Sequence, residues 1–152
     1  MIKDKIKGFW FFGLAGSGKS FASKLFYKKK KYLIIDGDQV RKLISQDLKY
    51  KKKDRDIQIN RVLGIAKIVI NSGFFPIITT VWMNKITLKE AKKIGIDIIK
   101  IERDFKEVKK ERNIYKSNKN VVGIDIFFEN LKTKKILNTG DKLFWKKLKK
   151  LI

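Results

Sequence analysis

The chain has 152 residues, the size of one compact domain, and we expect residues 1–152 to form a single domain. It contains neither Cys nor His, which excludes disulfides, thiolate zinc sites, cysteine nucleophiles and the commonest general base. Any chemistry must therefore use carboxylates, lysine, arginine, hydroxyls and backbone amides. Hydrophobic residues make up 43% of the sequence, so a folded core can form.

The net charge is +23, from 38 Lys and Arg against 15 Asp and Glu. A charge of this size suggests a polyanionic partner. However, only five of the basic residues are arginine, which phosphate and base recognition favours. The lysines are scattered over all segments and form no strip interleaved with aromatic residues. We therefore expect no specific nucleic-acid partner.

The start of the chain combines basic residues with a short apolar run, but it carries no cleavage pattern. No stretch approaches the roughly 18 apolar residues of a membrane span. We expect a soluble, cytoplasmic protein without a membrane partner. The sequence leaves the oligomeric state open, with a homodimer as one candidate.

Short apolar runs alternate with amphipathic stretches along the chain, as in a parallel sheet covered by helices on both faces. The runs are nearly all apolar, which is typical of strands buried on both sides. The sequence therefore predicts an α/β fold, a three-layer αβα sandwich with a five-stranded parallel sheet. In chain order the expected strands are Gly8–Phe12, Tyr32–Ile35, Pro76–Val81, Asp97–Ile101 and Lys135–Leu137. The expected helices are Lys19–Tyr27, Gln39–Ser45, Asp54–Asn71, Leu88–Ile94, Phe105–Arg112 and Lys142–Leu151.

Local signals refine this arrangement. Thr87 and Glu90 have the spacing of a capping box at the start of the fourth helix. Pro76, the only proline, is expected at a strand entrance because it cannot donate to the ladder. The polar stretch Lys116–Asn120 is a candidate mobile lid, and the lysine-rich C-terminal segment is expected to pack on the sheet rather than to anchor in a membrane.

The strongest motif is Gly13-Leu-Ala-Gly-Ser-Gly-Lys19-Ser20, a P-loop directly after an apolar strand and before a helical pattern. The glycines allow backbone amides to turn toward phosphate oxygens, Lys19 reaches the β- and γ-phosphates, and Ser20 offers a hydroxyl to Mg²⁺. A glycine-rich turn without a ligand would not require the Lys and Ser. The motif places the fold among P-loop NTPases and predicts ATP binding by Gly13, Ala15, Gly16, Ser17, Gly18, Lys19 and Ser20.

The second expected strand ends in Asp36-Gly37-Asp38, followed by Arg41. The carboxyl ends of strands meet at the ligand crevice of such a sheet, so these carboxylates face the P-loop edge. One of them could bind the metal or accept a proton from an attacking hydroxyl, with Arg41 neutralising an anionic substrate. The alternative is a simple turn in which Asp38 caps the next helix, and the two interpretations are compatible.

In this order, these residues resemble the adenylylsulfate kinase family, P-loop kinases that phosphorylate the ribose 3′-hydroxyl of adenylyl sulfate. The resemblance covers nearly the whole chain: Gly13–Ser20, Asp36–Arg41, Asp47–Arg61, Arg112 and Gly123-Ile124-Asp125. It implies that Asp36 is the catalytic or metal-associated carboxylate, and that Asp38, Arg41 and Arg55 contact the nucleotide substrate. It also places Arg112 as a lid arginine that contacts ATP, although a cation at a helix C-terminus is an equally simple role for it.

Departures from the family pattern concern the substrate pocket. The family's N-I-R-R becomes Gln58-Ile59-Asn60-Arg61, and the aromatic residue of its G-F-S becomes Tyr50. Val121 replaces the partner aromatic, Trp82 replaces a small residue after the third strand, and the loop after Arg112 is several residues shorter. The expected substrate-binding set is therefore Asp38, Arg41, Tyr50, Arg55, Gln58, Val81, Trp82 and Val121.

The sequence thus predicts an enzyme that transfers the γ-phosphoryl group of ATP to a ribose hydroxyl of a small nucleotide, by resemblance the 3′-hydroxyl of adenylyl sulfate. Lys19 and Asp36 are the expected catalytic residues, and Ser20 and Asp36 the expected Mg²⁺ ligands. Because the base pocket is rebuilt, a cytidine diphosphate derivative such as cytidine diphosphoramidate, used in polysaccharide modification, is an alternative acceptor. A nucleic-acid-binding P-loop ATPase and a non-catalytic nucleotide-binding module are further alternatives.

Overall fold

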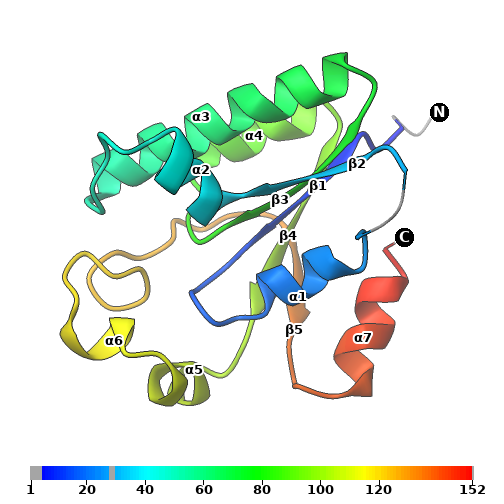
Figure 1. Cartoon of the computed structure of the whole chain (residues 1–152). Helices are drawn as coiled ribbons and strands as arrows, with labels where there is room; N and C mark the ends of the chain where they lie inside the picture. Colours follow the sequence, from blue (N-terminus) through cyan, green and yellow to red (C-terminus); the bar gives the residue numbers. More distant parts are fainter. Residues whose placement is uncertain (1–4, 28–29, 152) are drawn as a thin grey trace.

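A computed structural model describes residues 5–27 and 30–151, which form a parallel sheet between two layers of helices (Figure 1). The sheet order is β2-β3-β1-β4-β5, so the first strand lies at the centre and the chain builds outward on both sides. Every pair of neighbouring strands is parallel, which confirms the predicted α/β class. The strands are β1 (Gly8–Phe12), β2 (Tyr32–Asp36), β3 (Phe75–Thr80), β4 (Ile96–Glu102) and β5 (Lys134–Leu137).

The helices α3 and α4 cover one face of the sheet, and α1 and α7 cover the other (Figure 1). None of the described helices is long and apolar enough to cross a membrane. The helices are α1 (Lys19–Lys24), α2 (Gly37–Leu43), α3 (Lys52–Asn71), α4 (Lys85–Lys93), α5 (Phe105–Glu111), α6 (Ile114–Ser117) and α7 (Lys142–Lys149).

Strand β1 divides the core into two clusters because successive side chains of a strand point to opposite faces. Trp10 and Phe12 pack with the buried faces of α3 and α4. Phe9 and Phe11 pack with α1, β5 and α7, where Phe144 and Leu148 are buried. The C-terminal helix therefore packs on the sheet, as the sequence predicts.

The structure corrects several local predictions. Helix α4 begins at Lys85, and Asn84 caps it by accepting a hydrogen bond from the Thr87 amide at 2.8 Å, so the capping box from Thr87 is wrong. By contrast, Pro76 is the second residue of β3 and lies at the strand entrance as predicted, where a Cβ on Gly8 would lie 2.8 Å from its ring. The expected lid is also partly helical, because α6 occupies its first half.

Parallel strands bring several chain segments to one edge of the sheet. The loop after β1, the Asp36 end of β2, the Thr80 end of β3 and the segment after β4 all emerge there. Ligands of open α/β sheets bind at such an edge, so the fold places the candidate residues where a ligand crevice is expected.

Candidate active site

The loop from Gly13 to Ser20 turns sharply between β1 and α1. Gly13, Gly16 and Gly18 all have positive φ, at 151°, 84° and 105°. A Cβ on Gly13 would also lie only 2.3 Å from the Ile101 carbonyl oxygen. The backbone conformation therefore requires glycine at all three positions, as the P-loop motif predicts, and at Gly13 the close packing against β4 requires it as well.

Lys19 is held against the loop that precedes it. Its ammonium group donates hydrogen bonds to the carbonyl oxygens of Gly13 and Leu14, both at 2.8 Å. The pKa of Lys19 is lowered to about 8, chiefly by burial and also by the charge of Arg112, whereas Asp38 and Asp36 oppose this shift. These four charged groups therefore act on one another at the edge of the sheet.

Asp36 caps helix α2. Its Oδ1 accepts hydrogen bonds from the amides of Asp38 at 2.8 Å and Gln39 at 3.3 Å. The helix cap is thus Asp36, and the interpretation of Asp38 as the cap is wrong. Asp36 is half-buried and lines the cavity described next, so its role in capping leaves it beside the P-loop.

A cavity of about 590 Å³ joins the P-loop to the ends of β2 and β3. It brings together fourteen of the seventeen predicted site residues. The three others, Gly13, Ser17 and Gly18, belong to the P-loop but do not line it. The predicted residues in its wall are Ala15, Gly16, Lys19, Ser20, Asp36, Asp38, Arg41, Tyr50, Arg55, Gln58, Val81, Trp82, Arg112 and Val121. Two residues of the expected lid, Asn118 and Lys119, also line it. Residues that the sequence did not single out line it as well, including Thr79, Thr80, Asn113 and Tyr115.

Two arginines that line this cavity meet on the ring of Tyr50. The guanidinium carbons of Arg41 and Arg55 lie 4.7 Å and 5.6 Å from the ring centre. Arg55 is 7% exposed and donates to the carbonyl oxygens of Tyr50 at 3.1 Å and Asn120 at 3.0 Å. Burial and the charge of Arg41 lower the pKa of Arg55.

Neither of these arginines forms an ion pair within residues 5–27 and 30–151. A buried guanidinium without a carboxylate is unfavourable unless another anion balances it. Together, Arg41 and Arg55 therefore form a site that can bind an anionic group of a ligand. The Tyr50 ring, from the predicted substrate-binding set, packs against both guanidinium groups.

Gln58 also lines this cavity. It is 4% exposed, and its Nε2 donates to the Gly37 carbonyl oxygen at 3.1 Å. Its Oε1 is buried and has no hydrogen-bond partner among the described residues. A buried amide oxygen without a donor is costly, so Gln58 can accept a hydrogen bond from a ligand.

Trp82 lines the cavity, but its contacts show a packing role. It is 2% exposed, and its ring stacks on Phe128 with centres 5.4 Å apart. Its Nε1 donates to Asp56 Oδ1 at 2.8 Å, and Asn84 donates to the same oxygen at 2.8 Å. Burial alone would raise the pKa of Asp56, but the hydrogen bonds from Trp82, Asn84 and Lys52 lower it. Contact between Trp82 and a substrate stays a prediction.

The segment after α5 closes the cavity against the P-loop. A Cβ on Gly16 would lie 3.1 Å from Arg112 Nε, so the Arg112 side chain passes directly over this glycine. The Tyr115 hydroxyl donates to the Ala15 carbonyl oxygen at 2.7 Å. Val121 is buried beside Tyr115 in a small apolar cluster. These contacts favour the lid position for Arg112 over a simple helix-end cation.

The oxygen donors at this edge suit Mg²⁺, which prefers carboxylate and hydroxyl oxygens together with substrate phosphates. Ser20 is exposed, and it lines the cavity together with Asp36. No cluster of three or more acidic residues that could hold a metal by itself occurs in the described parts of the chain. The donor set therefore fits a metal held mainly by nucleotide phosphates, with one or two ligands from the protein.

A P-loop, an adjacent carboxylate and paired cations at one edge of a parallel sheet define the class of P-loop kinases. The sequence profile of the adenylylsulphate kinase family matches residues 6–134. The chain therefore belongs to the adenylylsulfate kinase family, and it is a phosphotransferase with an alcohol acceptor from a family that uses ATP.

Individual relatives agree with this assignment. The chain is 33% identical over 144 residues to the adenylyl-sulfate kinase of Clostridium acetobutylicum, covering 85% of this chain and 72% of that protein. It is 29% identical over 145 residues to a probable adenylyl-sulfate kinase of Bacillus subtilis, covering 84% and 73%. The APS kinase of Mycobacterium tuberculosis, solved with AMPPNP and APS, shares the fold with a TM-score of 0.79 at 20% identity, covering 97% of this chain and 95% of that one.

Proposed function

We propose that this protein transfers the γ-phosphoryl group of ATP to the 3′-hydroxyl of adenylyl sulfate. The observation that carries the proposal is the pair of guanidiniums, Arg41 and Arg55, which have no carboxylate partner in the described chain and share one cavity with the P-loop. An acceptor with an anionic phosphosulfate group would balance both charges. The relatives from Clostridium acetobutylicum and Bacillus subtilis, named as adenylyl-sulfate kinases, support the same acceptor.

In the proposed reaction, the acceptor oxygen forms a bond to the γ-phosphorus while the bond from that phosphorus to the bridging oxygen of ADP breaks. Asp36 orients the hydroxyl and takes its proton, because it is a carboxylate of a chain without histidine that lines the cavity beside the P-loop. Lys19 and Arg112 stabilise the negative charge on the transferred group. Mg²⁺, when bound, would neutralise phosphate charge beside Ser20 and Asp36.

The remaining predicted residues would hold the acceptor. Arg41 and Arg55 would bind its anionic group, and Asp38 would accept a hydrogen bond from its ribose. The Gln58 Oε1 would accept a hydrogen bond from an amino or hydroxyl group of the nucleotide, which would supply the partner that this oxygen lacks in the described chain. Val81, Trp82 and Val121 would form the apolar wall of the base pocket.

The test measures ADP release from ATP with and without added acceptor. Adenylyl sulfate should stimulate ADP release, and phosphorus NMR of the product should show a new 3′-phosphate. Parallel reactions with a cytidine diphosphate compound and with single-stranded oligonucleotides test the other acceptors. The K24A variant, which removes an exposed lysine of α1, serves as the matched control. ADP release that no acceptor stimulates, or that oligonucleotides stimulate most, would contradict the proposal.

A further inference from the structure

All six carbonyl oxygens from Gly13 to Gly18 accept hydrogen bonds. Lys19 donates to the carbonyls of Gly13 and Leu14, and the Ala22 amide of α1 donates to the carbonyl of Gly18. The central three carbonyls, of Ala15, Gly16 and Ser17, are instead held by side chains from distant parts of the chain. Their donors are Tyr115 at 2.7 Å, Arg103 at 3.2 Å and Asn138 at 2.9 Å.

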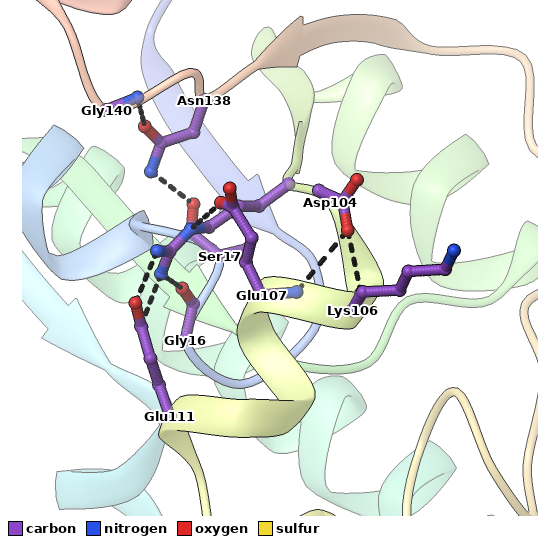
Figure 2. A network of polar contacts seen from close by, with 9 residues as sticks. Gly16, Ser17, Asp104, Lys106, Glu107, Glu111, Asn138 and Gly140 are labelled. Atoms are coloured by element: carbon purple, nitrogen blue, oxygen red, sulfur yellow. Dashed lines mark hydrogen bonds and ion pairs between the residues drawn. The ribbon is translucent and has the colours of Figure 1, made fainter.

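Arg103 is the only one of these three donors that belongs to a charged network. Its Nη1 and Nη2 donate to both carboxylate oxygens of Glu111, each at 2.7 Å. Figure 2 shows Glu111 and the Gly16 carbonyl converging on one guanidinium. Glu111 ends helix α5, and Asp104 caps the start of this helix by accepting hydrogen bonds from the amides of Lys106 and Glu107. Because the fork with Glu111 fixes the guanidinium plane, the N–H group that points to Gly16 has little freedom.

Gly16 is the position where such a restraint has the largest effect. Its φ is 84°, and glycine adopts positive and negative φ values with similar ease, so the backbone at this position has little intrinsic preference for the observed conformation. Tyr115 holds the peptide on one side of Gly16, and Arg103 holds the peptide on the other. Since the carbonyl and the following amide of a trans peptide point in opposite directions, these two contacts fix which way the neighbouring amides face.

The same network reaches the candidate lid. Glu111 is the last residue of α5, and Arg112 follows it directly and crosses over Gly16. Arg103 thus joins the crest of the P-loop, Ala15 to Ser17, to the end of helix α5, which Arg112 directly follows. A loss of this link would disturb both the loop amides and the arginine that lies over them.

We infer that Arg103, oriented by Glu111, is a positioning residue that holds the crest of the P-loop in the conformation that binds the phosphates of the donor nucleotide. The inference rests on nucleotide binding at the P-loop and does not depend on the identity of the acceptor. A loop that is already ordered loses less conformational entropy when the ligand binds, so the network should strengthen nucleotide binding.

The main test is the R103K variant of the full chain, which retains the positive charge but loses the fork. Isothermal titration with a non-hydrolysable ATP analogue and Mg²⁺ should show a Kd raised about tenfold, the loss expected for one charge-assisted hydrogen bond. The matched control is R61K, because Arg61 makes an equivalent fork with Asp47 at 2.6 and 2.8 Å but makes no hydrogen bond to the P-loop among the described residues. R61K should leave the Kd within about twofold.

The double substitution R103E/E111R separates positioning from simple anchoring of α5. It conserves the pair between positions 103 and 111 and the net charge, but it loses the 3.7 Å contact of Arg103 with Glu107 and places a carboxylate beside the Gly16 carbonyl. The Kd should therefore remain raised. Amide hydrogen exchange of Gly16–Gly18 should accelerate in R103K and not in R61K. The E111Q variant, which loses only the partner charge, should raise the Kd by a smaller factor. A wild-type Kd in R103K, or restoration of the Kd by R103E/E111R, would overturn the inference.

Discussion

In the donor half of the site, formed by the P-loop and by the Arg103, Tyr115 and Asn138 side chains that hold it, every carbonyl from Gly13 to Gly18 accepts a hydrogen bond from the protein itself. In the acceptor half, formed by Asp38, Arg41, Tyr50, Arg55 and Gln58, two guanidiniums have no ion pair and one buried amide oxygen has no donor among the described residues. The backbone carbonyls of the donor half are thus all satisfied, and only the buried Ser17 Oγ there has no partner among the described residues. The acceptor half instead presents unpaired charged groups together with an unpaired amide oxygen.

This difference suggests how each half contributes to phosphoryl transfer. In the donor half, hydrogen bonds within the protein already hold the P-loop backbone in place without a bound nucleotide. Its residues should therefore affect ATP binding and the rate of transfer. The acceptor half retains unpaired charges and an unpaired acceptor oxygen, so the substrate itself would complete its contacts. Substitutions in the two halves should therefore separate into effects on the KM for ATP and effects on the KM for the acceptor.

The largest effect is expected for D36N, because Asp36 lies between the two halves. Removing a general base should lower kcat by roughly 10²–10⁴-fold. Asn is as good a helix cap as Asp, so the hydrogen bonds to the amides of Asp38 and Gln39 should survive and the protein should remain folded. Steady-state kinetics and titration with an ATP analogue would measure the loss of turnover at unchanged nucleotide affinity.

The variant D38N provides the contrast, since Asp38 belongs to the acceptor half alone. It should raise the KM for the acceptor and retain most of kcat. If D38N were inactive and D36N close to wild type, the roles assigned to the two carboxylates would be exchanged.

The next largest effect is expected for K19A. Loss of a cation that stabilises developing negative charge should reduce kcat/KM by on the order of a hundredfold or more. The loss should appear with every acceptor, because Lys19 contacts the P-loop carbonyls of the donor half. The matched control K24A, on the same helix, should retain wild-type turnover. Equal activity of K19A and K24A would contradict the kinase mechanism.

The sheet and most of the site could be predicted from the sequence because their signals are local. The apolar runs identify all five strands to within two residues, and the spacing of Gly13, Lys19 and Ser20 identifies the P-loop. The short helix α6 was missed because four polar and apolar residues carry no measurable period. The helix cap at Asn84 was missed because a second plausible cap, Thr87, lies three residues later.

The positioning contacts could not be predicted because they join residues far apart in the sequence. The hydrogen bonds to the Gly16, Ala15 and Ser17 carbonyls span 87, 100 and 121 residues. Only the fork from Arg103 to Glu111 joins residues close in the sequence, because Arg103 lies just before α5 and Glu111 is the last residue of that helix. The packing of Trp82 on Phe128 is likewise a tertiary contact, and it shows why a residue next to a motif can belong mainly to the core.

The R55M variant tests the acceptor half directly. Removing a charge-assisted contact to an anion should raise the KM for the acceptor roughly tenfold to a hundredfold. The KM for ATP should stay within about twofold, because Arg55 contacts Tyr50 and Asn120 rather than the P-loop. The control K53M removes an exposed cation from the same helix and should change neither KM. An equal rise in both KM values for R55M would remove the distinction between the two halves.

The smallest expected effect concerns Asp56, which holds the Trp82 wall of the acceptor half. Its pKa is lower in the folded chain than the usual 3.8, despite burial, because Trp82, Asn84 and Lys52 donate to the carboxylate. A carboxylate with a depressed pKa stabilises the fold fully above its unfolded pKa, and this contribution is lost as the pH falls through the folded value. Acid should therefore weaken this wall, whereas the neutral Tyr115 and Asn138 donors of the donor half have no charge to lose in that range.

The D56N variant measures this contribution, because Asn can still accept from Trp82 and Asn84 but carries no charge. Its Tm should lie below the wild-type value by on the order of 2–4 °C near neutral pH, and the difference should shrink as the pH falls below about 4. D54N is the matched control, since it removes a carboxylate of α3 that makes no ion pair in the described chain, and its Tm should follow the wild type at every pH. A difference between D56N and wild type that stays constant in acid would mean that the shape of the side chain, and not its charge, holds the wall in place.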